Sequence, residues 1–128
     1  MRSYKFPKYF GFVSLIVLTM WFLSPAIAGP GDPAIARQAW PMIEAGALLI
    51  DVRSAEEYQD GHIEGAINIP HDQTSDLIVA IGADKQRPVV VYCRSGNRSS
   101  MAKAELVAKG YSGVYDATGY IVLKKTKP

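Results

Sequence analysis

The stretch from Pro88 to Gly110 reads PVVVYCRSGNRSSMAKAELVAKG, and its successive parts predict the fold. An unbroken apolar run, rich in β-branched residues, ends at Cys93. Such a run is typical of a central parallel strand that is buried on both faces. Residues 99–109 have the composition of a helix, with Gly110 in position to end it. The chain therefore places its only cysteine between a buried strand and a helix.

The residues after Cys93 favour a reactive thiol over a core cysteine. A cysteine that fills core space is the usual alternative for a lone cysteine. Here no apolar residue occurs from Arg94 to Ser100, and Arg94 and Arg98 flank the thiol. Positive side chains and the N–H groups at a helix N-terminus favour the thiolate, which is the nucleophilic form of cysteine. We therefore predict that Cys93 is a catalytic nucleophile.

Residues 1–28 have the three parts of a secretory signal peptide. Residues 1–8 are basic, residues 9–23 are almost wholly apolar, and the segment that follows ends in Ala26-Ile-Ala28. A membrane-spanning helix needs about 20 apolar residues, which is more than this run supplies. We predict cleavage after Ala28 and a periplasmic or secreted protein. The alternative is an uncleaved N-terminal helix that anchors the chain to the inner membrane.

The charge of the remaining chain excludes nucleic acid as a partner. The whole sequence has 14 basic and 12 acidic residues, a formal net charge of +2. Residues 1–28 contain three of the basic residues and none of the acidic ones, so the remainder carries 11 against 12. A domain that binds nucleic acid by its charge carries a clear basic excess.

With a single cysteine, the exported chain has no intramolecular disulfide, so the thiol is free for chemistry or for a link between molecules.

The rest of the chain alternates between helix and strand patterns, which predicts a largely parallel sheet. Helices are predicted for residues 34–45, 54–59 and 72–83, and strands for residues 47–52, 65–70 and 113–117. Pro41 is expected to break or restart the first helix, because it lacks an N–H group and clashes with the preceding turn. Ser54 and Glu57 match a capping box, which marks a helix start. The predicted division is a flexible lead at 29–33, one domain at 34–123 and a basic tail at 124–128.

Asp51 ends one predicted strand, as Cys93 ends another. In parallel α/β sheets, ligands bind beyond the carboxyl ends of the strands. Asp51 and Cys93 are therefore expected at the same edge of the sheet. The carboxylate of Asp51 can pair with Arg53 or with an arginine of the cysteine loop, or it can be satisfied by local N–H groups.

Two motifs make the chain resemble the rhodanese-like domains. The first is DVRSAEEYQDGHIEGAINIP, which begins at Asp51, and the second is VYCRSGNRS, which begins at Val91. The resemblance covers residues 34–123 and implies a three-layer α/β/α domain with a central, mostly parallel sheet. The closing segment departs from the family. Two glycines and a later tryptophan are often found there, whereas this chain has Ala117-Thr-Gly-Tyr120 and no later tryptophan.

The resemblance implies a sulfurtransferase that uses no cofactor or metal. In this family the loop cysteine takes a sulfane sulfur from an anionic donor such as thiosulfate and becomes a persulfide. The sulfur then passes to a nucleophilic acceptor, cyanide or a thiol. We expect a monomer with no stable membrane contact once the signal peptide is removed.

The resemblance and the residue types together assign roles around Cys93. The expected anion-binding loop is Arg94, Ser95, Gly96, Asn97, Arg98 and Ser99. Gly96 allows the backbone to curl so that successive N–H groups point inward and hold an anion. Arg94 is expected to recognise the donor and Arg98 to organise the loop. Asp51 and Arg53 are expected to support the loop from the neighbouring strand end.

Two other functions fit parts of the pattern. Phosphatases and arsenate reductases of the same fold have a related loop, with one more residue between the cysteine and the arginine. Here four residues separate Cys93 from Arg98, and the tighter loop favours attack on sulfur. A non-catalytic sulfur-carrying or binding module is the second alternative, although the retained cysteine argues against it.

His62 is expected to be structural. The histidines and the cysteine lie on separate loops, so no metal site is predicted.

Overall fold

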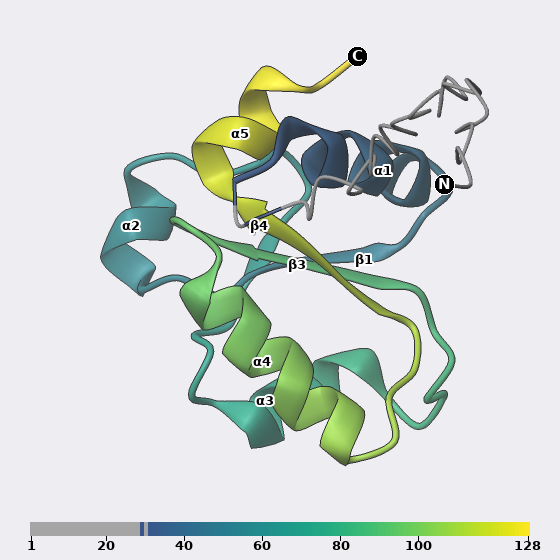
Figure 1. The fold of residues 1–128 in the computed structure, drawn as a ribbon. Helices are drawn as coiled ribbons and strands as arrows, with labels where there is room; N and C mark the ends of the chain where they lie inside the picture. Colours follow the sequence, from purple (N-terminus) through teal and green to yellow (C-terminus); the bar gives the residue numbers. More distant parts are fainter. Residues whose placement is uncertain (1–28, 30) are drawn as a thin grey trace, which may run out of the picture.

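The computed structural model describes Gly29 and residues 31–128, so the predicted signal peptide lies outside the described residues. Figure 1 shows the elements in chain order. They are α1 (Pro33–Glu44), β1 (Leu48–Asp51), α2 (Ala55–Gln59), β2 (Ile67–Asn68), α3 (Thr74–Ile81), β3 (Val89–Cys93), α4 (Asn97–Ala108), β4 (Val114–Gly119) and α5 (Tyr120–Lys125). Within these residues, every helix is too short or too polar to cross a membrane.

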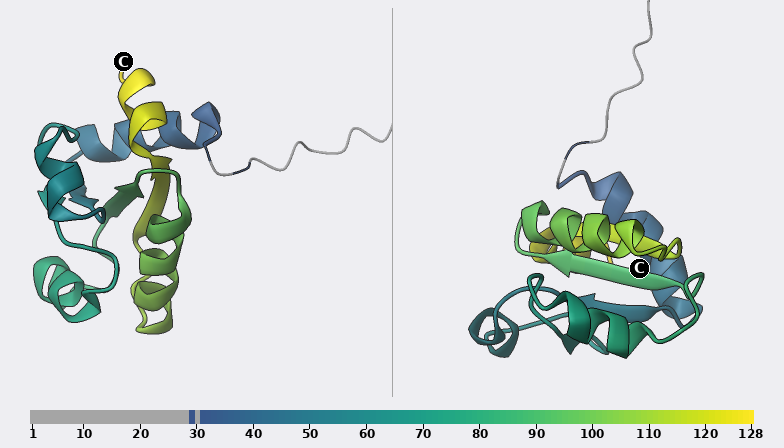
Figure 2. Two further views of the ribbon diagram at one scale, coloured as in Figure 1. Left: turned by 90° about the vertical axis from the view of Figure 1, so that its left-hand side faces the viewer. Right: turned by 90° about the horizontal axis from the view of Figure 1, so that it is seen from below.

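The four strands form one parallel sheet in the order β2-β1-β3-β4, with helices on both faces. Helices α1 and α5 cover one face, and α3 and α4 cover the other (Figures 1 and 2). This is the predicted three-layer α/β/α arrangement. Parallel strands need crossover connections, and the helical segments between them provide these. The carboxyl ends of β1 and β3 lie side by side, because Asp51 pairs in register with Tyr92.

Strand β3 lies at the centre of the sheet and has all five residues buried, as its apolar sequence predicts. Val89 and Val91 point to the face of the sheet that α3 and α4 cover, and they are part of the core on that side. Val90 and Tyr92 pack into the second core, under α1 and α5. Because successive strand residues point to opposite faces, one short run takes part in both cores. The position of Cys93 is thus set by a strand that is held from both sides.

Pro41 does not break the first helix, contrary to the expectation from the sequence. Helix α1 runs without interruption from Pro33 to Glu44. Pro41 is exposed, and so is Arg37, whose carbonyl loses its helical partner at the proline. Water can therefore solvate that carbonyl, while the buried Trp40 holds the helix on the sheet. The indole Nε1 of Trp40 donates to the carbonyl of Leu123 at 3.1 Å, which ties α1 to α5.

Helix boundaries also differ from the predicted division at both ends of the domain. Asp32 caps α1 by accepting a hydrogen bond from the N–H of Ala34 at 2.7 Å, so the predicted flexible lead ends in a helix start. At the other end, α5 continues through Lys124 and Lys125, the first residues of the predicted basic tail. The start of α1 follows from local sequence, because Asp32 is a favourable N-cap and Pro33 suits the first helical position.

Thr118 has a backbone conformation that favours glycine, in the segment where the family often has two glycines. Its backbone has φ +68°, and it is the one non-glycine residue with positive φ in the described part of the chain. A β-branched residue in this region is strained, whereas glycine adopts it freely. The next residue, Gly119, lies against the cysteine loop, since a Cβ there would sit 2.9 Å from the carbonyl oxygen of Arg94. Gly119 therefore lets the end of β4 pass close to the loop after Cys93.

Replacing Thr118 by glycine is expected to stabilise the protein by about 1 kcal/mol. The change removes backbone strain and a buried hydroxyl oxygen that has no hydrogen-bond partner. These gains outweigh the greater chain entropy that glycine loses on folding. Urea unfolding of Thr118→Gly measures the change, and Thr118→Ala, which removes only the hydroxyl and a methyl, separates the two contributions. A less stable Thr118→Gly protein would show that the turn is not strained.

Candidate functional site

Cys93 ends β3 with its thiol enclosed by the loop that follows. The residue is 1% exposed. The backbone N–H of Gly96 donates to Sγ at an N–S distance of 3.0 Å, and Ser99 Oγ lies 3.4 Å from Sγ. Gly96 has φ +101°, a backbone conformation that side-chain-bearing residues rarely adopt, which turns its N–H back toward the cysteine. The inward curl predicted for Gly96 is thus present, with one N–H bonded to the sulfur.

Helix α4 starts immediately after this turn and directs its N-terminus at the loop. Gly96 is the N-cap and has no side chain to bond the N–H groups of the first turn. Arg98 lies within the helix, which begins two residues earlier than the sequence predicts. The unpaired N–H groups of the first turn and the helix dipole place partial positive charge beside Sγ. This field stabilises a thiolate and any anion that approaches it.

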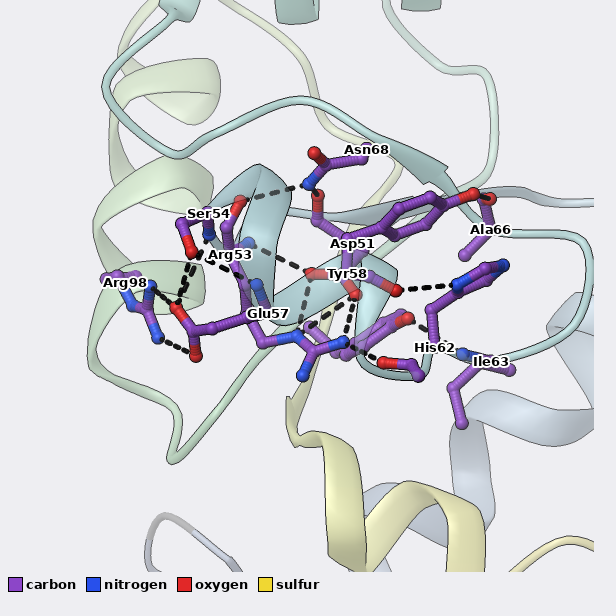
Figure 3. Close-up of polar contacts among 12 residues, drawn as sticks. Asp51, Arg53, Ser54, Glu57, Tyr58, His62, Ile63, Ala66, Asn68 and Arg98 are labelled. Atoms are coloured by element: carbon purple, nitrogen blue, oxygen red, sulfur yellow. Dashed lines mark hydrogen bonds and ion pairs between the residues drawn. The ribbon is translucent and has the colours of Figure 1, made fainter.

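Arg98 points to Glu57, as Figure 3 shows. Its Nη1 lies 2.6 Å from Oε1 and its Nη2 lies 3.0 Å from Oε2, which is a two-pronged ion pair. The hydrogen bond to Glu57 raises the pKa of the Arg98 guanidinium, and the charge of Cys93 raises it further. Arg98 therefore ties the first turn of α4 to α2 and adds positive charge near the thiol. This geometry fits the role of loop organiser proposed for it.

Glu57 joins the site through Arg98, a contact that the sequence did not predict. Its capping box was predicted and is present: Glu57 accepts from Ser54 N at 3.4 Å, and Ser54 Oγ accepts from Glu57 N at 3.3 Å. The same carboxylate also forms the ion pair with Arg98, so one side chain joins the start of α2 to the cysteine loop. Glu57 and Arg98 are 41 residues apart in sequence, so the sequence pattern does not indicate this contact. The one available signal for this contact is that Glu57 lies inside the first family motif, but its role in the capping box already explained it.

Removing the charge of Glu57 is expected to lower the free energy of unfolding near pH 6 and to have little effect in strong acid. Hydrogen bonding to Arg98 lowers the pKa of Glu57 from its ordinary 4.5 to about 2. A carboxylate with a lowered pKa stabilises the fold above the unfolded value, and this contribution disappears as pH falls from about 4.5 to about 2. We expect Glu57→Gln, which can keep the capping box, to lose about 1 kcal/mol at pH 6. Urea unfolding should give stabilities that converge as the pH falls through about 2, and a pH-independent difference would contradict the assignment.

Asp51 pairs with Arg53, one of the partners that the sequence left open, and does not contact the loop arginines. Both Asp51 carboxylate oxygens accept from Arg53 Nε at 3.0 Å, and Oδ2 also accepts from Nη2 at 2.6 Å. The backbone N–H of Arg53 donates to Oδ1 at 2.9 Å. Burial by itself lowers the pKa of Arg53, but the hydrogen bond and charge of Asp51 outweigh it and the pKa is raised. The pair is buried, and Figure 3 shows the hydrogen bonds that join the two side chains.

Arg53 also forms part of a hollow beside the cysteine loop. Its guanidinium carbon lies 4.4 Å from the ring centre of Tyr120 and it donates from Nη2 to the carbonyl of Gly61 at 2.7 Å. The hollow measures about 310 Å³ and is lined by Arg53, Glu57, Asp60, Arg94, Tyr120 and Ile121. Arg94 is exposed there, one residue after the cysteine. Arg53, held in place by Asp51, thus forms part of the wall of this hollow, and neither residue has a hydrogen bond to Sγ.

His62 takes the structural position expected for it. Its Nδ1 lies 2.9 Å from the carbonyl oxygen of Tyr58, and its ring stacks on the Tyr58 ring with centres 3.7 Å apart. Neither contact involves the cysteine loop. Among residues 29 and 31–128, no cluster of histidine, cysteine and acidic side chains is arranged to hold a metal ion.

A buried thiol lies at a strand end, and a short loop and then a helix follow it. Residues 36–121 match the rhodanese-like domain, so the chain belongs to that family. The thiosulfate sulfurtransferase GlpE of Pseudomonas savastanoi pv. phaseolicola is 40% identical over 82 residues, 64% of this chain and 76% of that protein. The thiosulfate sulfurtransferase PspE of Escherichia coli is 38% identical over 97 residues, 74% of this chain and 85% of that protein. A solved E. coli rhodanese with anions is 40% identical, with a TM-score of 0.56 over 60% of this chain and 91% of that one.

Proposed function

We propose that this protein is a thiosulfate sulfurtransferase that works through a persulfide on Cys93. The observation that carries the proposal is the environment of Sγ, which receives the Gly96 N–H at 3.0 Å beside the N-terminus of α4. Such a site favours the thiolate and also an anionic donor. Curated relatives of similar length bear the name thiosulfate sulfurtransferase, which supports the same substrate class here.

The reaction has two half-steps, each a displacement at sulfur. The Cys93 thiolate attacks the outer sulfur of thiosulfate, the sulfur–sulfur bond of the donor breaks, and sulfite leaves with the bonding electron pair. An acceptor, cyanide or a thiolate, then attacks the outer sulfur of the persulfide, and Cys93 leaves as the thiolate. No cofactor is required, because a covalent intermediate divides the transfer into two simpler steps.

Intact-mass analysis tests the proposal directly. Protein incubated with thiosulfate should gain the mass of one sulfur atom, and cyanide should remove that mass while thiocyanate forms. A protein that gains no sulfur, yet hydrolyses an aryl phosphate, would instead support the phosphatase alternative. A protein that gains sulfur from a donor but passes it to no small acceptor would support a sulfur-carrying module.

Arg94 is the residue proposed to recognise the donor. It is exposed in the hollow beside the loop, so its guanidinium can pair with the oxygens of an incoming sulfur anion. We expect Arg94→Ala to raise the KM for thiosulfate about tenfold while changing kcat less, because the lost contact is made in the bound ground state. Steady-state kinetics over a range of thiosulfate concentrations measures this. An unchanged KM removes Arg94 from donor recognition.

The protein is also proposed to act outside the cytoplasm as a monomer. The basic start, apolar run and small-residue exit of residues 1–28 support export followed by cleavage after Ala28. Cell fractionation and N-terminal sequencing of the recovered protein test this. A protein that begins at Gly29 in the periplasmic fraction supports the proposal, whereas a membrane-bound full-length chain supports the anchor alternative. Size-exclusion chromatography with light scattering tests the monomeric state.

A further inference from the structure

The hydroxyl of Ser99 lies between two acceptors but has one proton to donate. Its Oγ is 3.4 Å from Sγ of Cys93 and 3.2 Å from the carbonyl oxygen of Gly96. Ser99 is fully buried, so water does not compete for either position. A serine hydroxyl has one O–H donor and two acceptor lone pairs. The state of the sulfur therefore decides where the Ser99 proton points.

The two protonation states of Cys93 require different arrangements. A neutral thiol can donate its S–H to Ser99 Oγ, and the Ser99 proton then goes to the Gly96 carbonyl, so every group is paired. A thiolate has no proton, and the favourable arrangement turns the Ser99 O–H toward Sγ. In that state the sulfur accepts both the Ser99 hydroxyl and the fixed N–H of Gly96. Hydrogen bonds to an ionised group are stronger than those between neutral groups.

We propose that Ser99 is a catalytic residue whose hydroxyl follows the charge on Sγ, donating to it whenever it is a thiolate and returning to the Gly96 carbonyl when it is not. The proposal rests on the sulfur-transfer function proposed above and assigns a new role within it. Ser99 contacts the reacting atom, unlike Arg98, whose guanidinium is held by Glu57.

The charge on Sγ changes twice in one catalytic cycle. When the thiolate attacks thiosulfate, a new S–S bond forms at Sγ, sulfite leaves, and the negative charge of the enzyme moves to the outer sulfur of the persulfide. Ser99 then releases Sγ and bonds the Gly96 carbonyl. When the acceptor takes the outer sulfur, the electron pair of the broken bond returns to Sγ, and Ser99 donates to it again. Its hydrogen bond therefore stabilises the leaving thiolate in the second half-step, where charge develops in the transition state.

Ser100 provides a matched control on the same turn of α4. Its hydroxyl donates to the carbonyl of Asn97 at 2.8 Å, and the residue is exposed. Ser100→Ala removes the same chemical group from the adjacent position without removing any contact of Sγ. Ser99→Ala removes only one oxygen atom from the core, so the fold should persist, and thermal unfolding of both variants checks this.

The test measures the sulfur chemistry of wild type, Ser99→Ala and Ser100→Ala. For Ser99→Ala, the midpoint of the pH profile of iodoacetamide alkylation should move up by about one pH unit, and cyanide should discharge the preformed persulfide about tenfold more slowly. Ser100→Ala should match wild type in both. A Ser99→Ala protein with the wild-type alkylation midpoint and discharge rate overturns the proposal. If wild type itself forms no persulfide, the proposed function fails instead, and the alkylation profile alone still decides whether Ser99 stabilises the thiolate.

Discussion

Replacing Cys93 by serine is expected to lower kcat/KM for sulfur transfer by about 10³-fold or more. Serine has nearly the same shape, but its hydroxyl stays protonated near neutral pH and cannot form a persulfide. The loop has no second thiol to replace it, since Cys93 is the only cysteine in the sequence. The measurement is thiocyanate formation from thiosulfate and cyanide, together with the intact mass after donor treatment.

The Cys93→Ser protein should remain folded, which separates lost chemistry from lost structure. The side chain is enclosed, so the smaller oxygen leaves a slight gap, but the Gly96 N–H can still find an acceptor. Thermal unfolding should therefore change by only a few degrees. If Cys93→Ser kept the sulfurtransferase rate, the persulfide mechanism would be wrong. If it kept only the biological effect of the protein, the domain would act as a binding module.

Replacing Asp51 by asparagine is expected to destabilise the protein by about 3–5 kcal/mol. The carboxylate is fully buried and accepts three hydrogen bonds from the Arg53 guanidinium, which is itself 5% exposed. Asparagine removes the charge and turns one acceptor into a donor, so the guanidinium is left buried without its counter-charge. Urea unfolding at neutral pH measures the loss, and it should appear as a lower midpoint.

The double variant Asp51→Asn/Arg53→Met is the control for this prediction. Removing the buried cation together with its partner should recover most of the stability lost in Asp51→Asn, because no uncompensated charge remains. A single variant that loses less than about 1 kcal/mol would show that water reaches Arg53 in place of the carboxylate. The readout of this control is stability alone, because Arg53 lines the hollow that holds Arg94 and its removal can change donor binding.

The central part of the fold could be predicted from sequence because its signals are local. A short apolar run rich in β-branched residues is typical of a strand buried on both faces, and β3 is such a strand. The capping box at Ser54 and the turn at Gly96 depend on residues a few positions apart, and both occur as the residue types indicate. The resemblance to the rhodanese-like domains supplied the order of the layers.

Other features could not be predicted because distant residues decide them. Pro41 is tolerated since the packing of Trp40 and the exposure of the freed carbonyl outweigh the local cost. The capping box with Ser54 already explained Glu57 locally, and its second partner, Arg98, lies 41 residues away in sequence. The positive φ of Thr118 is visible only in the structure, where the next residue, Gly119, lies close to the carbonyl of Arg94.

The sequence by itself determined that one thiol stands between a buried strand and a helix, which requires no knowledge of distant contacts. Tertiary structure decided which partner each charged group near that thiol takes. It directs Arg98 to Glu57 and encloses Asp51 with Arg53, whereas the Gly96 N–H and the Ser99 hydroxyl reach Sγ through the local turn after Cys93. The physical reason is that each charged group takes the partner that burial brings within hydrogen-bond distance, and sequence spacing does not specify that partner.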